Sequence, residues 1–191
     1  MIRRTIDVLV AGIGLIVTAP VVLVAMLVIR IESHGHPIYR QRRVGRDGVP
    51  FDLYKLRTMV TGAEHIGAGL AVNEGDPRIT RVGGLLRRLS LDELPQLVNV
   101  LKGDMSLIGP RPERPDFVRL FERNVHRYND RHRVKSGITG WAQVHGLRGK
   151  TSLSDRVEWD NHYIENWSLW LDVKILLMTV WAVRRYFAQA E

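Results

Sequence analysis

The chain has 191 residues, which suits one folded domain with a single core, and its composition of 45% apolar and 25% charged residues excludes extensive disorder. It contains no cysteine, which excludes disulfides and cysteine-ligated metal sites. The net charge of +8 favours an anionic partner but does not choose among nucleic acid, acidic lipid and phosphorylated metabolites.

An uncharged stretch of 22 residues, 8–29, lies near the N-terminus. About 20 apolar residues cross a bilayer as a helix. The stretch is longer than the core of a signal peptide, and Arg30 and Glu32 follow it with no small-residue cleavage site. We therefore predict a retained membrane segment over residues 1–32, followed by a second unit over residues 33–191.

The flanking charges leave the topology of this segment open. Two arginines precede the uncharged stretch and five follow it between residues 30 and 46, although positive residues normally mark the cytoplasmic side only. Pro20 follows Ala19 and is expected to kink a helix, with Thr18 satisfying a freed carbonyl nearby. Two interpretations remain: a helix-break-helix that returns to the same face at Ala19-Pro20, or a kinked helix that spans the bilayer.

The next segments predict a small β-hairpin. Residues 37–44 and 49–56 favour strands, and Gly45-Arg-Asp-Gly48 between them is typical of a turn. Residues 61–78 are rich in glycine and predict a loop.

The middle of the chain predicts mostly helix. Residues 78–89 and 91–101 carry apolar side chains at helical spacing, and Gly103 is expected to end the second helix. We further expect a rigid turn at 108–112, a charged helix over 113–133, a glycine-rich loop over 137–150 and a helix over 154–163. The predicted fold class is therefore α+β and mostly helical.

The last segment, residues 166–187, contains three tryptophans. Its longest uncharged run, residues 175–183, is too short to span a bilayer. Tryptophan favours the membrane interface, where the ring is buried and the indole N–H stays hydrated, so an amphipathic interfacial helix is one interpretation. The alternative is a core helix with ordinary buried tryptophans.

Two adjacent carboxylates, Asp92 and Glu93, also allow two interpretations. Ser90 and Glu93 match a capping box, and acids suit the start of a helix. However, Arg87 precedes the acids and a second basic loop contains Arg111. A carboxylate nucleophile, a divalent metal and arginines are the groups that phosphoryl transfer requires.

Five ordered blocks carry a family resemblance over nearly the whole chain. They are YKLRTM at 54–59, LSLDELPQL at 89–97, NVLKGDMSLIGPRP at 99–112, GITGWAQV at 137–144 and YIENWSLWLD at 163–172. These blocks resemble the monotopic phosphoglycosyl transferases, which include the bacterial sugar transferases that begin capsule, exopolysaccharide and glycoprotein glycan synthesis.

The resemblance implies a reaction and its principal residues. Asp92 would attack the β-phosphorus of a UDP-sugar and expel UMP, and the phosphosugar would then pass from Asp92 to undecaprenyl phosphate. Mg²⁺ is implied as cofactor, with Asp92 and Glu93 as its ligands. The resemblance also favours a re-entrant helix broken at Ala19-Pro20. It places residues 33–191 as a catalytic domain on the cytoplasmic face of the bacterial inner membrane, in contact with membrane lipids.

The same resemblance marks arginines for substrate phosphates. Arg87 is the first choice, followed by Arg111, Arg148 and Arg57, although each is also explained by a solvated or structural charge. His145 stands where the family commonly has asparagine, close to the expected site, and leaves the identity of the sugar open; the Gly-Leu-Arg-Gly that follows it is associated with hexose-1-phosphate transferases.

Three further expectations concern partners and alternatives. Relatives can be dimeric, so a homodimer is expected. The sequence shows no nucleic-acid-binding signature, so no nucleic acid is expected as a partner. The alternative to an enzyme is a non-catalytic membrane-anchored scaffold of the same fold, against which the intact Asp92-Glu93 pair argues.

Overall fold

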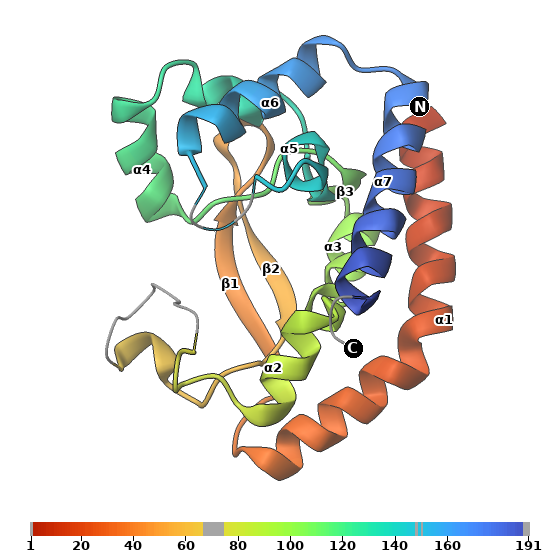
Figure 1. The fold of residues 1–191 in the computed structure, drawn as a ribbon, viewed down its shortest axis with the longest axis vertical. Coiled ribbons are helices and arrows are strands. Elements are labelled where there is room, and N and C mark those ends of the chain that lie inside the picture. The colour runs from red at the N-terminus through yellow and green to blue at the C-terminus, as the bar shows by residue number, and fades with distance from the viewer. Residues whose placement is uncertain (1, 67–74, 148, 150, 189–191) are drawn as a thin grey trace.

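The computed structural model describes residues 2–66, 75–147, 149 and 151–188 (Figure 1). Helices dominate, and the described strands form one antiparallel and one parallel two-stranded sheet. The α+β, mostly helical fold class is therefore confirmed. Arg148 and part of the expected 61–78 loop lie outside the described residues.

The N-terminal segment is one helix, α1 (Ile2–Glu32), which changes direction part-way along its length (Figure 1). Pro20 lies inside it and cannot donate to the carbonyl of Ile16. Thr18 Oγ1 donates to the carbonyl of Gly14 at 2.7 Å, so the expectation that Thr18 satisfies the freed carbonyl is wrong. This back-bonding itself bends helices.

Both ends of α1 are attached to the rest of the molecule. Near the start, the Asp7 carboxylate accepts hydrogen bonds from Ser106 Oγ at 2.8 Å and from the Leu107 N–H at 3.0 Å. At the end, the Glu32 carboxylate accepts from the Val82 N–H at 3.2 Å. Between these contacts most of the helix surface is apolar and exposed, and this is the one described helix long and apolar enough to cross a membrane.

The predicted hairpin is confirmed. Strands β1 (Ile38–Val44) and β2 (Pro50–Leu56) pair antiparallel, with Ile38 opposite Leu56 and Val44 opposite Pro50. The turn contains the short 3₁₀ segment η1 (Arg46–Gly48). A further 3₁₀ segment, η2 (Ala63–His65), lies in the expected loop.

The central helices are shorter than expected. Helix α2 (Arg81–Arg88) begins after Thr80, whose Oγ1 accepts from the Gly83 N–H. The predicted 91–101 helix is divided into the 3₁₀ segment η3 (Leu91–Glu93) and helix α3 (Gln96–Lys102). Gly103 ends α3 with φ 91°, as predicted.

The second half adds a buried parallel pair, β3 (Met105–Ile108) and β4 (Ser136–Thr139), which the sequence did not predict because these four-residue strands carry little alternation. Val100 and Met105 form the core with Ala11 of α1 and Ile175. The expected 113–133 helix is broken into α4 (Pro115–Asn124) and η4 (Tyr128–Arg133), and the expected 137–150 loop contains helix α5 (Trp141–Val144).

Helix α6 (Leu153–Glu165) confirms the 154–163 prediction, and α7 (Leu169–Ala188) forms the last described helix. The side chains of Trp167, Trp170 and Trp181 are exposed. The core-helix interpretation is therefore wrong for these tryptophans, and the interfacial position of α7 stays a prediction.

Candidate active site

A pocket of ≈ 740 Å³ opens between the hairpin, η2, η3 and the loop that precedes α4. The polar side chains that line it come from segments far apart in the sequence. They include Tyr39, Gln41, Arg43, Lys55, Arg57, Thr58, Arg87, Asp92, Glu93, Arg111 and Arg114. The acidic pair and three of the predicted arginines, at 57, 87 and 111, therefore lie in one cavity.

The acidic pair lies in a 3₁₀ turn and not in a helix start. Ser90, which precedes the turn, has φ 55° and its side chain makes no capping hydrogen bond. The capping-box interpretation is therefore wrong. A non-glycine residue in the left-handed region is held there by its surroundings, and such strain clusters at functional sites.

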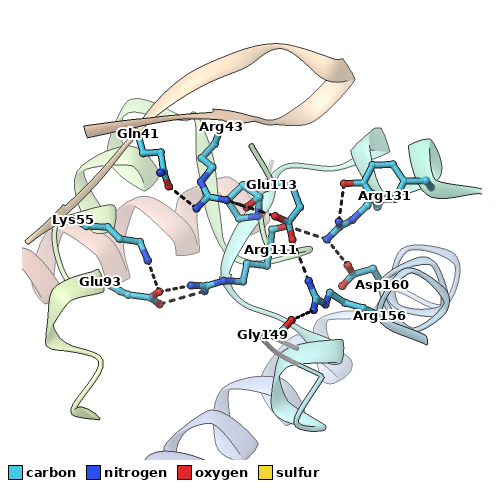
Figure 2. Close-up of polar contacts among 12 residues, drawn as sticks. Gln41, Arg43, Lys55, Glu93, Arg111, Glu113, Arg131, Gly149, Arg156 and Asp160 are labelled. Atoms are coloured by element: carbon cyan, nitrogen blue, oxygen red, sulfur yellow. Dashed lines mark hydrogen bonds and ion pairs between the residues drawn. The ribbon is translucent and has the colours of Figure 1, made fainter. Parts of the chain in front are cut away.

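Glu93 is held by two cations (Figure 2). Its Oε1 accepts from Lys55 Nζ at 2.8 Å and from Arg111 Nη2 at 2.6 Å. Burial alone raises the pKa of a carboxyl, but the Arg111 and Lys55 charges and hydrogen bonds hold the pKa of Glu93 well below its usual range. Glu93 is therefore a fixed anion whose partners come from β2 and from the loop before α4.

Asp92 has the opposite environment. Its side chain is buried, with the residue 8% exposed, and it makes no hydrogen bond to any residue that the structure describes. Burial raises the pKa of Asp92, which Lys55 opposes and the Glu93 charge reinforces. Because the two carboxyl groups have such different surroundings, they suit different roles. Asp92 has its oxygens free to attack a substrate atom.

Arg87 is oriented by a buried hydroxyl. Its Nε donates to Thr58 Oγ1 at 2.7 Å, and Thr58 is buried at the end of the hairpin. Within the described part of the chain, only Nε of this guanidinium is hydrogen-bonded. Both Nη groups are therefore available to a phosphate, for which a guanidinium fork is the preferred protein donor.

Arg111 is fixed from behind by a second arginine (Figure 2). Arg131 is almost fully buried and its Nη2 donates to the Arg111 carbonyl at 2.9 Å and to Asp160 Oδ2 at 2.7 Å. The next carbonyl, that of Pro112, accepts from Arg43 Nη1 at 3.0 Å. Two guanidinium groups thus hold the backbone that carries Arg111.

A family model described as bacterial sugar transferase matches residues 1–186. This chain belongs to the bacterial sugar transferase family. The resemblance inferred from the five sequence blocks is therefore confirmed.

Three relatives illustrate the match. The chain is 46% identical to a UDP-N-acetylgalactosamine-undecaprenyl-phosphate N-acetylgalactosaminephosphotransferase of Aeromonas hydrophila, over 94% of this chain and 43% of the relative. It is 44% identical to a UDP-glucose:undecaprenyl-phosphate glucose-1-phosphate transferase of Caulobacter vibrioides, over 93% and 68%. It is 43% identical to an uncharacterized sugar transferase of Bacillus subtilis, over 94% and 86%. The chain therefore spans less than half the length of the Aeromonas relative, and the same holds for several further relatives of 41–42% identity.

The other two predicted arginines, Arg57 and Arg148, differ in outcome. Arg57 lines the pocket, but its Nη1 donates to the His34 carbonyl at 2.8 Å and its Nη2 to the Ser33 carbonyl at 2.7 Å, which favours the structural explanation. Arg148 lies outside the described residues, although Gly149 lines the pocket.

His145 was expected close to the candidate site. Its ring instead lies between those of Trp141 and Trp159, with centroid distances of 4.2 and 4.3 Å, and it does not line the pocket. The side chain of His145, directly after α5, thus packs against α6 and is not part of the pocket lining.

One of the two carboxylates in the pocket fits the implied Mg²⁺. Mg²⁺ in such sites takes one or two protein carboxylates and fills its remaining positions with water and substrate phosphate oxygens. Asp92 has free oxygens that suit this, whereas both oxygens of Glu93 already contact Arg111. Among the described residues, no three acidic or histidine side chains converge on one point. Asp92 is therefore the principal candidate ligand.

Three side chains at or behind the pocket were not predicted from the sequence: Lys55, Arg43 and Arg131. Lys55 lies inside the first sequence block. Arg43, Gln41 and Tyr39 occupy every second position of β1 and so share one face of the strand, which made Arg43 detectable as part of a polar face. No comparable signal marks Arg131, because it lies within a charged stretch that resembles a solvated helix.

Proposed function

We propose that the chain transfers a sugar-1-phosphate, a hexose-1-phosphate, from a UDP-sugar to undecaprenyl phosphate. The observation that carries this proposal is the buried, unpaired Asp92 carboxylate beside Lys55, Arg87 and Arg111 in one pocket. The names of the Aeromonas and Caulobacter relatives specify UDP-sugar donors and undecaprenyl phosphate as acceptor, which supports the same substrates here.

In the first step, an oxygen of Asp92 attacks the β-phosphorus of the donor. A bond forms between this oxygen and phosphorus, and the bond from phosphorus to the bridging oxygen breaks, so that UMP leaves with the electron pair. The product is a phosphosugar joined to Asp92 as an acyl phosphate. The Nη groups of Arg87 donate toward the phosphoryl oxygens, where negative charge gathers.

In the second step, a phosphate oxygen of undecaprenyl phosphate attacks the same phosphorus. The bond to Asp92 breaks, the carboxylate is regenerated and undecaprenyl-diphosphate-sugar is released. Dividing the transfer in this way lets the soluble donor product leave before the lipid reacts. Glu93 keeps Lys55 and Arg111 in place throughout both steps.

Mg²⁺ would neutralise diphosphate oxygens when bound, and Asp92, with Glu93 beside it, would hold it. The chain's own contribution is to bury most of Asp92 and to orient cations around it. We infer that chelation of Mg²⁺ abolishes turnover.

The contacts of α1 support a re-entrant membrane segment. Its 31 residues would extend about 46 Å as a straight helix, more than a hydrocarbon core of about 30 Å. A spanning helix would place Asp7 and Glu32 on opposite sides of the bilayer, yet both contact the same domain through Ser106 and Val82. We therefore propose that α1 enters and leaves on the cytoplasmic face of the inner membrane, with its bend at Ala19-Pro20.

Labelling of single cysteines tests this topology, because the native chain contains none. Cysteine at position 2 and cysteine at the exposed position 31 should both react from the cytoplasmic side of inverted membrane vesicles. Reaction of position 2 only from the opposite side would establish a spanning helix.

An activity assay tests the reaction. The purified protein in detergent is incubated with UDP-glucose or UDP-N-acetylgalactosamine, undecaprenyl phosphate and Mg²⁺, and UMP release is measured. Labelled donor should also leave a phosphosugar adduct on residue 92. Turnover without that adduct in rapidly quenched samples would remove Asp92 as the nucleophile.

The absence of turnover with every UDP-sugar would instead favour the non-catalytic scaffold.

We place the reaction at the first membrane step of exopolysaccharide, capsule or glycan synthesis, because the lipid-linked sugar is the acceptor on which a longer glycan is built. The homodimer stays a prediction.

A further inference from the structure

A second group of cations lies in the same pocket, beyond Arg111. Tyr39, Gln41 and Arg43 share one face of β1, since alternate residues of a strand point the same way. Lys55, which binds Glu93, lies directly opposite Tyr39 in the hairpin. The row of side chains therefore starts beside the acidic pair and leads away from it.

Hydrogen bonds fix this row. Gln41 Nε2 donates to the Tyr39 hydroxyl at 2.8 Å, and Arg43 Nη2 donates to Gln41 Oε1 at 2.6 Å, while the Tyr39 hydroxyl itself donates to Glu64. The guanidinium of Arg43 is thus bent back over Gln41, which lies about 7 Å along the strand from Tyr39. The charges that act on Arg43 are those of Glu113, Arg111 and Arg114, so this guanidinium lies at the end of the row that leads away from the acidic pair.

Two nitrogen atoms in this region lack an acceptor. Arg114 Nη1 and Arg43 Nε are buried, and neither has a hydrogen-bond partner within the described residues. Burial lowers the pKa of Arg43 to about 10; Glu113 opposes this change, whereas the like charges of Arg111 and Arg114 add to it. Buried donors without acceptors and neighbouring like charges both cost folding free energy. A ligand with anionic oxygens would satisfy the donors and offset the repulsion.

The position of these arginines separates them from the membrane segment. Arg114 immediately precedes α4, and the neighbouring Glu113 pairs with Val44 at the turn end of β1. In Figure 1, α4 lies on the far side of the hairpin from α1. A lipid acceptor would approach from the exposed apolar surface of α1, whereas a water-soluble donor would enter from the α4 side.

We propose that Arg114 and Arg43 form the subsite for the phosphate of the departing nucleoside monophosphate. This inference rests on the proposed function. When the bond to the β-phosphorus breaks, the electron pair stays on the leaving phosphate, and the N–H groups of Arg114 and Arg43 donate to its oxygens without transferring a proton. Guanidinium groups suit this role because they bind phosphate oxygens through charge-assisted hydrogen bonds.

Binding of UMP and of uridine tests the proposal by calorimetry on the detergent-purified protein. Arg114→Gln should raise the Kd for UMP at least about tenfold, the effect of one charge-assisted hydrogen bond. The same change should leave the Kd for uridine unaltered, because uridine has no phosphate. Arg114→Lys keeps the charge but loses the fork, and should give an intermediate Kd for UMP.

Arg42→Gln is the matched control. Arg42 is adjacent to Arg43 but points to the opposite face of β1, where its side chain is 59% exposed and pairs with Asp52. Its substitution should change neither Kd. Thermal unfolding midpoints of all variants check that the fold is retained, and Arg114→Lys remains informative if Arg114→Gln does not fold.

Two results would overturn the assignment. The first is unaltered UMP binding by both Arg114 variants. The second is an Arg114→Gln protein that no longer binds a short-chain prenyl phosphate but still binds UMP as the parent does. That result would show that the subsite binds the phosphate of the lipid acceptor. A parent protein that binds UMP through Arg114 but releases no UMP from any UDP-sugar would instead refute the proposed function and, with it, the leaving-group role.

Discussion

Arg111 Nη2 lies 2.6 Å from Oε1 of Glu93, and this contact joins the loop before α4 to the acidic turn. Lys55 binds the same oxygen from the other side of the pocket. Glu93 is therefore occupied by protein cations, and the adjacent Asp92 is left as the carboxylate with free oxygens. The asymmetry between two neighbouring acids determines which of them can form a covalent bond.

Replacement of Asp92 should separate activity from stability. Asp92→Asn removes the nucleophile, so UMP release should fall by several orders of magnitude. The fold should nevertheless be as stable as the parent or more stable at pH 7, because a buried, unpaired carboxylate is replaced by a neutral isostere. Asp52→Asn, on the exposed side of the hairpin, is the control and should retain turnover. A destabilised, active Asp92→Asn protein would contradict the assignment.

The stability gain of Asp92→Asn should depend on pH. The folded-state pKa of Asp92 is raised above its ordinary value of 3.8, so ionisation in the folded protein costs stability at pH values above that raised pKa. The gain should therefore be present at neutral pH and vanish as the pH falls below about 4. Urea unfolding of parent and variant across this range measures it, and a gain that grows toward acid would refute the sign.

The contributions of Glu93 and Lys55 to the free energy of unfolding should be strongly coupled. Glu93→Gln leaves Lys55 and Arg111 without their anion, and we expect destabilisation of about 2–4 kcal/mol, since Lys55 and Glu93 are largely buried and the Arg111 side chain is 35% exposed. Adding Lys55→Met should recover part of this loss. Because the pKa of Glu93 is depressed in the folded protein, the stability that Glu93 contributes should be fully present at pH values above 4.5, the ordinary pKa of a glutamate. It should be lost as the pH falls below that value toward the depressed pKa. A double-mutant cycle by urea unfolding gives the coupling, and additive single effects would argue against it.

Two neighbouring glycines of α2 should behave differently. A Cβ on Gly83 would lie 2.1 Å from the Thr58 carbonyl oxygen, so Gly83→Ala forces α2 away from the strand end that orients Arg87. We expect a loss of about 1–3 kcal/mol together with reduced turnover. Gly84→Ala meets only Ile79 at 4.0 Å and should stabilise the helix by about 0.5–1 kcal/mol. Equal melting temperatures of the two variants would contradict this packing.

Arg131 should act as a positioning residue. Arg131 uses Nη2 for Asp160 and the Arg111 carbonyl and Nη1 for the Tyr128 hydroxyl, and the shorter, single-nitrogen side chain of Arg131→Lys cannot reproduce this geometry, so Arg111 should move away from Glu93. We expect kcat to fall about tenfold with little change in KM for the donor, because the substrate contacts themselves remain. Arg133→Lys, an exposed change in the same 3₁₀ segment, should leave both constants unaltered. An equal rise in KM would indicate instead that Arg131 supports binding.

The sequence by itself determined the features that depend on local signals. The length of the apolar stretch determined α1, the Gly45–Gly48 turn determined the hairpin, and Gly103 determined the end of α3. These predictions succeeded because each rests on residues close together in the chain. The motif blocks also indicated the acidic pair and the family.

Only the tertiary structure showed that Asp92 and Glu93 have different roles. Glu93 has no partner within its own turn, and its cations lie 38 residues before it in β2 and 18 residues after it in the loop before α4. Sequence spacing does not encode such contacts, because they depend on how the hairpin packs against η3. For the same reason, only the folded chain showed that Arg57 binds the carbonyls of Ser33 and His34 while Arg87 keeps its Nη groups free.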